Sequence, residues 1–407
     1  MFLSVLKRRN PEFLEAVASL HASGSLPPNC TVLDLDAISR NARAFVGEAR
    51  RLGLTSFVMT KQLGRNRDAL RVLADAGLSS AVAVDLECAI AARAGGLQIG
   101  HLGHLVQIPR HRVGEGVALT PRYWTVFSMD KAVEVGRAST AAGQVQDVLL
   151  RIHAEGDLFY RGHEGGFPAE DIVQVAEMVG RIPGLRVRGI TTFPAMLFDR
   201  SSRTVQPTPN LRTLEAARTR LADAGMENIE LNAPGTTSSA TLQEVADHGA
   251  TQVEPGHGIT GTTPWHAFED LVEEPAMLYL TEVSHAVGDD VFVFGGGLYA
   301  DPVLPGATTR ALVFRPGDGV ETALETDVEM PAADVIDYYA ILPGARRQTG
   351  TGDGVILGFR PQVFVTRSLT AGITGVGSGM PQVAGVWSAN GSGPVTVEDA
   401  LRSGGAS

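Results

Sequence analysis

The stretch SFVMTKQLGRN, residues 56–66, places a lysine directly after a short apolar run. Ser56 to Met59 has the apolar character of a buried strand, and Lys61 stands where that strand would end. The glycine and two arginines that follow predict a turn. A buried amine is costly without a partner. Its position therefore makes Lys61 a candidate functional group, with a solvated loop residue as the ordinary alternative.

The same strand pattern recurs along the chain and alternates with helical spacing. Stretches such as PAEDIVQVAEMVGRIPG, which opens with proline and ends at glycine, predict the helices between the strands. Such alternation predicts parallel strands with helical crossovers. Eight strand-like runs close a (β/α)8 (TIM) barrel, and a doubly wound open sheet is the alternative, although no G-x-G-x-x-G follows an early strand. The eight runs are SFVMT (56–60), SAVAV (80–84), QIGHL (98–102), WTVFS (124–128), DVLLRI (147–152), VRGITTF (187–193), IELN (229–232) and TQVE (251–254).

The sequence predicts three parts. Residues 1–30 contain one amphipathic helix, PEFLEAVASLH, and are interpreted as an arm that packs on another surface. Residues 31–275 form the predicted barrel, an α/β domain. From residue 276 to residue 407, strands separated by glycine- and proline-rich turns predict a separate β domain.

The composition excludes several classes of protein. The 407 residues include 45 acidic and 34 basic side chains, and the net charge of −11 argues against a nucleic-acid groove or an anionic membrane surface. No apolar run approaches the roughly 20 residues that cross a bilayer, and the first residues have the wrong order for a secretory signal. Two cysteines, Cys30 and Cys88, cannot make a disulfide framework, so we expect a cytoplasmic protein.

Two glycine-bearing turns at neighbouring strand ends predict an anion site. NAPGTTSSA (232–240) precedes a helix, where backbone N–H groups can bind an anion, although a plain N-cap needs only one of its hydroxyls. VEPGHGITG (253–261) is the second turn and contains Glu254. Barrels often hold phosphate after strands seven and eight. Next to a lysine, this arrangement suggests pyridoxal phosphate.

These motifs resemble the alanine-racemase-like (fold type III) family of pyridoxal-phosphate enzymes, and within it the YhfX-like branch. FVMTKQLGRN is similar to the family's VVKANAYGHG, which implies that Lys61 forms the internal aldimine with the cofactor. GGGLYADP is similar to IGYADG, whose tyrosine is the second catalytic base, so Tyr299 is its counterpart. VEPGHGITG resembles VRPGIALYG, and NAPGTTSSA stands where the family has its phosphate strand. The cofactor-binding residues implied by these two turns are Asn232, Gly235, Thr236, Thr237, Gly256 and His257.

Glu254 departs from the family pattern. It stands where alanine racemases have an arginine that faces the pyridine nitrogen. A carboxylate there favours the protonated ring by charge pairing. Since a pyridinium is a stronger electron sink, we expect quinonoid-type chemistry.

Other family positions also differ. The cofactor-stacking histidine is replaced within TTFPA, so His153 is a candidate to stack on the ring, with a core histidine as the alternative. Arg65 is a candidate phosphate clamp in place of the family's tyrosine. Arg161 lies near the position of the family's arginine that binds the substrate carboxylate. His163 is the competing candidate for that role.

We expect no metal site. His101 and His104 have the spacing of metal ligands, but no carboxylate or cysteine accompanies them in their segment.

The predicted reaction is racemisation or epimerisation of a small amino acid. Lys61 would serve one face of Cα and Tyr299 the other, and the resemblance implies a head-to-tail homodimer. A decarboxylase of this fold would carry a cysteine in the β domain, and the chain has none after Cys88. A metal-assisted aldolase or dehydratase of this fold would need a histidine with a carboxylate or cysteine in the β domain. The β domain contains one histidine, His285. The further alternative, a non-catalytic cofactor carrier, is a single barrel in its known examples.

Overall fold

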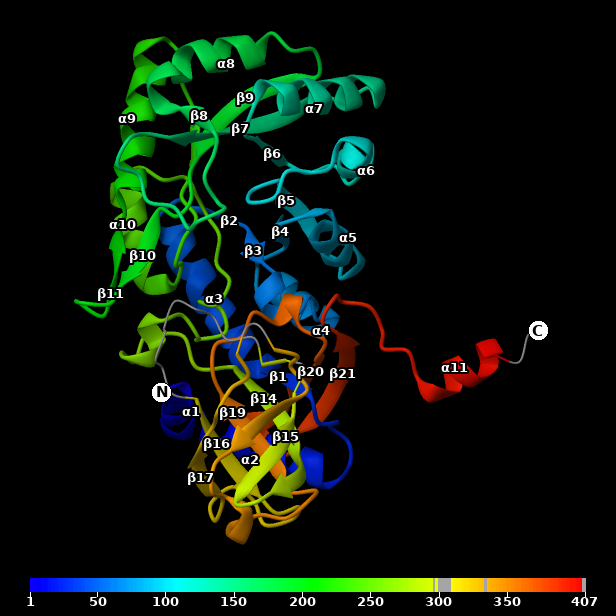
Figure 1. Cartoon of the computed structure of the whole chain (residues 1–407). Helices are drawn as coiled ribbons and strands as arrows, with labels where there is room; N and C mark the ends of the chain where they lie inside the picture. Colours follow the sequence, from blue (N-terminus) through cyan, green and yellow to red (C-terminus); the bar gives the residue numbers. More distant parts are fainter. Residues whose placement is uncertain (296, 299–308, 333–334, 405–407) are drawn as a thin grey trace. The chain divides into compact units, whose positions relative to one another are not determined.

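The chain folds into two compact units. The computed structural model describes residues 1–295, 297–298, 309–332 and 335–404 (Figure 1). The barrel unit comprises Ala37–Lys61 and Leu70–Pro275. The strand-rich unit comprises Met1–Asp36, Gln62–Ala69 and Ala276–Ser407.

Parallel strands close on themselves in the barrel unit, which confirms the predicted barrel. The strand order is β2-β13-β12-β9-β7-β6-β5-β4-β3. β2 (Thr55–Ser56) and β3 (Val58–Met59) flank Phe57 in one extended stretch, so these two halves of one strand close both sides of the ring. The N–H groups of Phe57 and Met59 donate to the carbonyl oxygens of Val253 (3.0 Å) and Pro255 (2.7 Å). The other strands are β4 (Ser80–Ala83), β5 (Gln98–Leu102), β6 (Tyr123–Val126), β7 (Gln146–His153), β9 (Leu185–Thr191), β12 (Glu230–Asn232) and β13 (Gln252–Val253).

Helices alternate with these strands along the chain. α3 buries Ile38, Ala42, Phe45 and Ala49, which share one helical face. The carboxylate of Asp85 caps the N-terminus of α5 by accepting from the N–H of Cys88 at 2.7 Å. The helices are α3 (Leu35–Arg51), α4 (Arg67–Asp75), α5 (Leu86–Ala94), α6 (Val113–Ala118), α7 (Met129–Ala141), α8 (Ile172–Gly180), α9 (Pro209–Asp223) and α10 (Leu242–Asp247). β8 (Phe167–Pro168) pairs in parallel with the end of β7, and β10 (Met196–Asp199) pairs with β11 (Thr204–Pro207).

The first strand of the chain does not belong to the barrel unit. β1 (Cys30–Asp34), which we expected at the start of the barrel domain, pairs with β14 (Met277–Val287) and β20 (Leu369–Thr374) in the strand-rich unit. All five of its residues are buried, as in a central strand covered on both faces. The sheet order is β17-β16-β19-β14-β1-β20-β21, and β15 joins β14 to β18. The remaining bounds are β15 (Asp290–Phe294), β16 (Arg310–Phe314), β17 (Leu324–Asp327), β18 (Tyr339–Leu342), β19 (Gly354–Gly358) and β21 (Gln382–Ser388).

The N-terminal segment contains two helices where we expected one. α1 (Phe2–Arg9) and α2 (Pro11–Ala22) pack their apolar side chains into one core with residues of β1, β14, β16, β19 and β20. Leu3, Phe13 and Val17 are fully buried there. The expected arm is therefore an integral layer of the strand-rich unit. The described chain ends with α11 (Val397–Gly404), and no helix in the described residues is long and apolar enough to span a bilayer.

Candidate functional site

Lys61 lies at the carboxyl end of the first barrel strand. β3 ends at Met59, and a short 3-10 turn begins at Lys61, whose side chain is half-buried. Burial lowers the pKa of both His104 and His163, and the positive charge of Lys61 lowers both pKa values further. The amine therefore lies within electrostatic reach of two histidines from other strand ends.

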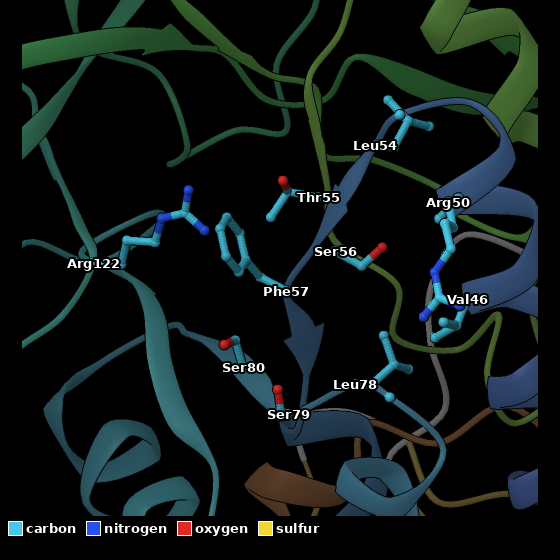
Figure 2. Close-up of a pocket in the computed structure, with 13 residues that line it drawn as sticks. Val46, Arg50, Leu54, Thr55, Ser56, Phe57, Leu78, Ser79, Ser80 and Arg122 are labelled. Carbon is cyan, nitrogen blue, oxygen red and sulfur yellow. The ribbon is translucent and has the colours of Figure 1, made fainter.

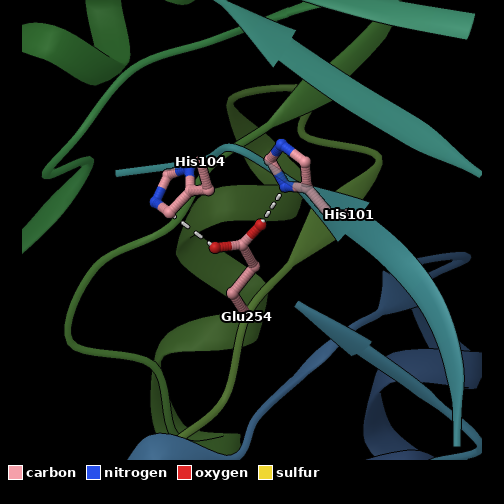
Figure 3. Close-up of side chains that lie close together, drawn as sticks. All are labelled: His101, His104 and Glu254. Carbon is pink, nitrogen blue, oxygen red and sulfur yellow. Dashed lines mark hydrogen bonds and ion pairs between the residues drawn. The ribbon is translucent and has the colours of Figure 1, made fainter. Parts of the chain in front are cut away.

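Glu254 lies at the corresponding end of the last strand and is 5% exposed. Its Oε1 atom accepts hydrogen bonds from His101 Nδ1 at 2.6 Å (Figure 3) and from Asn232 Nδ2 at 3.0 Å. A threonine hydroxyl contacts the opposite side of each donor side chain. The Thr125 hydroxyl lies 2.5 Å from His101 Nε2, and the Thr191 hydroxyl donates to Asn232 Oδ1 at 2.7 Å.

The second oxygen of this carboxylate is different. Oε2 has no hydrogen-bond partner among the described residues, and the Nε2 atom of His104 lies 3.4 Å away. A buried carboxylate oxygen without a donor is costly. Glu254 therefore presents an open acceptor inside the barrel.

The charge on Glu254 is favoured by its surroundings. Burial alone would raise its pKa, but His104, His101 and the hydrogen bonds from His101 and Asn232 outweigh burial and lower the pKa of Glu254 below its ordinary value. His104 itself stays neutral at pH 7, because burial lowers its pKa to about 3. The site therefore holds a carboxylate next to a neutral imidazole.

The two glycine-bearing turns pack against each other. A Cβ atom on Gly258 would collide with the carbonyl oxygen of Thr237, so only glycine permits this approach. The N–H groups of Gly235, Thr237, Gly256 and Gly258 have no acceptor within the described chain. Unpaired N–H groups in buried turns are rare in folded proteins. These four are consistent with the predicted anion site.

The start of the helix that follows the first turn offers fewer free N–H groups to the predicted anion site than its sequence suggests. The N–H of Ser239 donates to the carboxylate of Glu273 at 2.7 Å, and the N–H of Ser238 donates to the Thr241 hydroxyl at 3.1 Å. Thr236 is also engaged, because its N–H donates to the carbonyl of Met196 at 2.9 Å. In this segment the N–H groups without an acceptor therefore lie in the turn before the helix, at Gly235 and Thr237.

Sequence reasoning missed Arg151. Its side chain is fully buried on β7, and its guanidinium donates to the carbonyls of His163 (2.9 Å) and Phe193 (3.3 Å). Burial lowers the pKa of Arg151 to about 10, opposed by the negative charge of Glu254. Its Nε atom has no partner in the part of the chain that the structure describes. An arginine inside an otherwise apolar strand, VLLRIH, is the signal that could have identified it.

The structure also places four other predicted residues. His153 lines a pocket of about 690 Å³ with residues of 154–157, 168–170 and 209–220. Arg161 has a 99% exposed side chain that lies 3.7 Å from Glu164, whereas His163 is within the electrostatic reach of Lys61. Arg65 belongs to the strand-rich unit, where its guanidinium lies over the ring of Phe364.

Two further predicted residues complete the set. His257 is buried, with its Nδ1 atom 3.0 Å from the Thr262 hydroxyl. Tyr299 lies outside the described residues.

The structure brings a carboxylate to the two histidines that the sequence shows without one. Glu254 is the carboxylate partner that the His101–His104 segment lacks, and it comes from 153 residues beyond His101. Ligand atoms of the three side chains lie within 4.8 Å of one another. Local sequence could not reveal this cluster, because the barrel brings together strands that are distant in the chain.

A second polar pocket, of about 420 Å³, lies at the opposite end of the strands (Figure 2). It is lined by residues at the starts of β2 and β4, by Arg50 of α3 and by Arg122 before β6. Both arginines are exposed. The catalytic groups of such barrels lie at the other end.

Comparisons with known proteins agree with this geometry. The alanine racemase N-terminal domain model matches residues 33–264, and the YhfX-like C-terminal domain model matches residues 278–383. The protein YhfX of Escherichia coli (strain K12) is 39% identical over 385 residues, which are 95% of this chain and 97% of that protein. The chain belongs to the YhfX branch of the alanine-racemase-like family.

Solved structures show the same fold at low identity. D-threonine aldolase from Filomicrobium marinum has a TM-score of 0.66 at 17% identity and covers 90% of this chain and 96% of its own. D-threo-3-hydroxyaspartate dehydratase from Delftia sp. HT23 has a TM-score of 0.64 at 16% identity, covering 88% and 97%. Alanine racemase of Clostridium difficile 630, in complex with cycloserine, has a TM-score of 0.60 at 13% identity, covering 88% and 98%. The YhfX branch thus shares its fold with racemases, aldolases and dehydratases.

Proposed function

We propose that this chain is a pyridoxal-5'-phosphate enzyme that racemises or epimerises an amino acid at Cα. The observation that carries the proposal is the open acceptor Oε2 of Glu254, at the same end of the barrel as Lys61 and four unpaired N–H groups. The cofactor offers three matching groups: an aldehyde for the amine, a ring N–H for the carboxylate and a phosphate for the N–H groups.

The residues would hold the cofactor as follows. Lys61 would bind it covalently through Nζ. Glu254 would accept the ring N–H at Oε2, while Asn232 and His101 keep Oε1 in place. The turns of Gly235, Thr237, Gly256 and Gly258 would bind the phosphate. When bound, pyridoxal phosphate withdraws electrons from Cα of the amino acid that it carries.

Two side chains would move the proton. Lys61 Nζ would take the Cα proton from one face, and the Tyr299 hydroxyl would return one to the other face. His163 is a candidate to contact the substrate, because it lies within the electrostatic reach of Lys61. We further propose a homodimer in the cytoplasm.

Product analysis distinguishes this reaction from the others of the fold. The purified, cofactor-loaded protein would be incubated with a panel of L- and D-amino acids, with chirality, aldehyde, keto acid and carbon dioxide followed together. Racemisation without the other three products is expected. Aldehyde release would instead support the aldolase reaction, and keto acid the dehydratase reaction.

Isotope exchange tests the two bases. In deuterium oxide, Lys61→Ala should lose exchange at Cα for one enantiomer and Tyr299→Phe for the other, because each base serves one face. Wild-type exchange of both enantiomers in both variants would rule out the two-base scheme.

A further inference from the structure

A chain of buried polar side chains crosses the barrel interior and centres on Glu254. It runs Thr125–His101–Glu254–Asn232–Thr191, and its members other than Glu254 are fully buried. Polar groups in a dry interior are costly unless each one is hydrogen-bonded. Such an arrangement requires a reason beyond packing.

The donors in this chain all point towards the carboxylate. The Thr191 hydroxyl donates to Asn232 Oδ1, so Asn232 presents its N–H groups to Glu254. On the other side the carboxylate can only accept, so His101 Nδ1 is the donor to Oε1, and the Thr125 hydroxyl lies 2.5 Å from Nε2 at the far side of the ring. Oε1 therefore accepts two hydrogen bonds, and Oε2 accepts none from the described residues.

Resting on the proposed function, we propose that His101 is a positioning residue for the cofactor. Locked by Thr125, it fixes Oε1 of Glu254 so that Oε2 remains free for the ring N–H of pyridoxal phosphate. It acts on the cofactor only through the carboxylate. Its removal should weaken binding only of cofactors that carry a ring nitrogen.

His104 provides the contrast within the same segment. Its Nε2 atom lies 3.4 Å from Oε2, and its Nδ1 atom has no partner among the residues described. Its ring packs against those of His101 and Phe193, with centroids 5.2 and 5.6 Å away. His104 therefore packs beside the carboxylate without anchoring it.

The contact between His101 and Glu254 fits a hydrogen bond better than two ligands of one metal ion. Two tetrahedral ligands that each lie about 2 Å from a zinc ion stand about 3.3 Å apart. His101 Nδ1 and Glu254 Oε1 are 2.6 Å apart, which is the length of a charge-assisted hydrogen bond.

Two cofactors test the inference. Wild type, H101L, H101N and H104L would be titrated with pyridoxal phosphate and with its 1-deaza analogue, in which carbon replaces the ring nitrogen. H101L should raise the Kd for pyridoxal phosphate about tenfold or more, because it removes a hydrogen bond to a charged group, but leave the Kd for the analogue unchanged. H101N, whose amide nitrogen replaces Nδ1, should regain most of the affinity, and H104L should change the two Kd values equally.

Nitrogen-15 chemical shifts of labelled cofactor give a second readout. The ring nitrogen should be protonated in wild type and less so in H101L. If H101L does not fold, Thr125→Val replaces it, with a smaller effect of the same kind. Equal losses for both cofactors, or stoichiometric zinc in wild type that H101L lacks, would overturn the inference. A wild type that binds neither cofactor refutes the proposed function as well, whereas wild-type binding that H101L and T125V leave unchanged refutes only the role of His101.

Discussion

Both ends of the barrel unit carry polar groups, but these groups lack partners at one end and are solvated at the other. At the carboxyl ends of the strands, Oε2 of Glu254 is buried without a hydrogen-bond partner in the described chain, and the N–H groups of two turns have no acceptor there. At the amino ends, Arg50 and Arg122 border an open pocket and are exposed (Figure 2). A buried unpaired group costs about 1–3 kcal/mol, whereas an exposed arginine is solvated. The groups left unpaired by the fold, rather than the opening itself, indicate where a ligand binds.

The sharpest test of this difference is the charge on Glu254. Glu254→Gln keeps the shape of the side chain but removes the negative charge that stabilises a protonated ring. We expect Cα–deuterium exchange to slow by about a hundredfold, the cost of losing one group aligned with developing charge. Asn232 and His101 remain as donors, so the fold should persist. Exchange at the wild-type rate would refute the electrostatic role of Glu254.

The second test concerns the packed turns. Gly258→Ala places a methyl group against the Thr237 carbonyl and should push the turns apart. Binding of pyridoxal phosphate should weaken about tenfold, because several N–H contacts are lost together, while binding of pyridoxal, which has no phosphate, should not change. Gly47→Ala on α3, where a methyl group meets open space, is the matched control. Equal losses for both ligands in G258A would argue against a phosphate site there.

The third test uses pH. Because the pKa of His104 is lowered from 6.5 to about 3, the unfolded chain binds a proton between these values that the folded chain does not. Stability should therefore fall as the pH falls from 6.5 towards 3, by about 2 kcal/mol at pH 5 for this group. Urea unfolding at pH 7 and pH 5 should show a smaller acid loss in His104→Phe than in wild type. An equal loss of unfolding free energy in the variant and in wild type would show that His104 is protonated in the folded protein.

The smallest effects are expected at the other end of the barrel. Arg50→Ala and Arg122→Ala remove exposed side chains and should change the free energy of unfolding by less than about 0.5 kcal/mol. Exchange at Cα should stay within twofold of wild type. A loss comparable to that of Glu254→Gln would show that both ends of the barrel contribute to the reaction.

Local sequence predicted the barrel because each of its strands has its own signature. The eight runs from 56–60 to 251–254 are short, apolar and bounded by turns, and each became a strand of the ring or part of one. The run TVLDL near residue 33 has the same signature but pairs with β14 and β20. A strand's apolar pattern does not specify its partner, because pairing depends on contacts across hundreds of residues.

The site was predictable in part for the same reason. Lys61 and Glu254 stand at strand ends, which sequence can recognise. The contact of His101 with Glu254 spans 153 residues and follows from ring closure, so no local pattern contains it. The sequence placed Arg161 by its likeness to a family motif, and the structure adds that its side chain is exposed.

The proposed covalent link between Lys61 and pyridoxal phosphate can be tested directly. Purified protein would be loaded with the cofactor, reduced with borohydride, digested and mapped by mass spectrometry, with Arg122→Ala and Glu254→Gln treated in parallel. We expect one modified peptide, containing phosphopyridoxyl-Lys61, in wild type and in R122A, and a lower yield at the same residue in E254Q. Absence of the modification, or its appearance on another lysine, would refute the covalent link at Lys61.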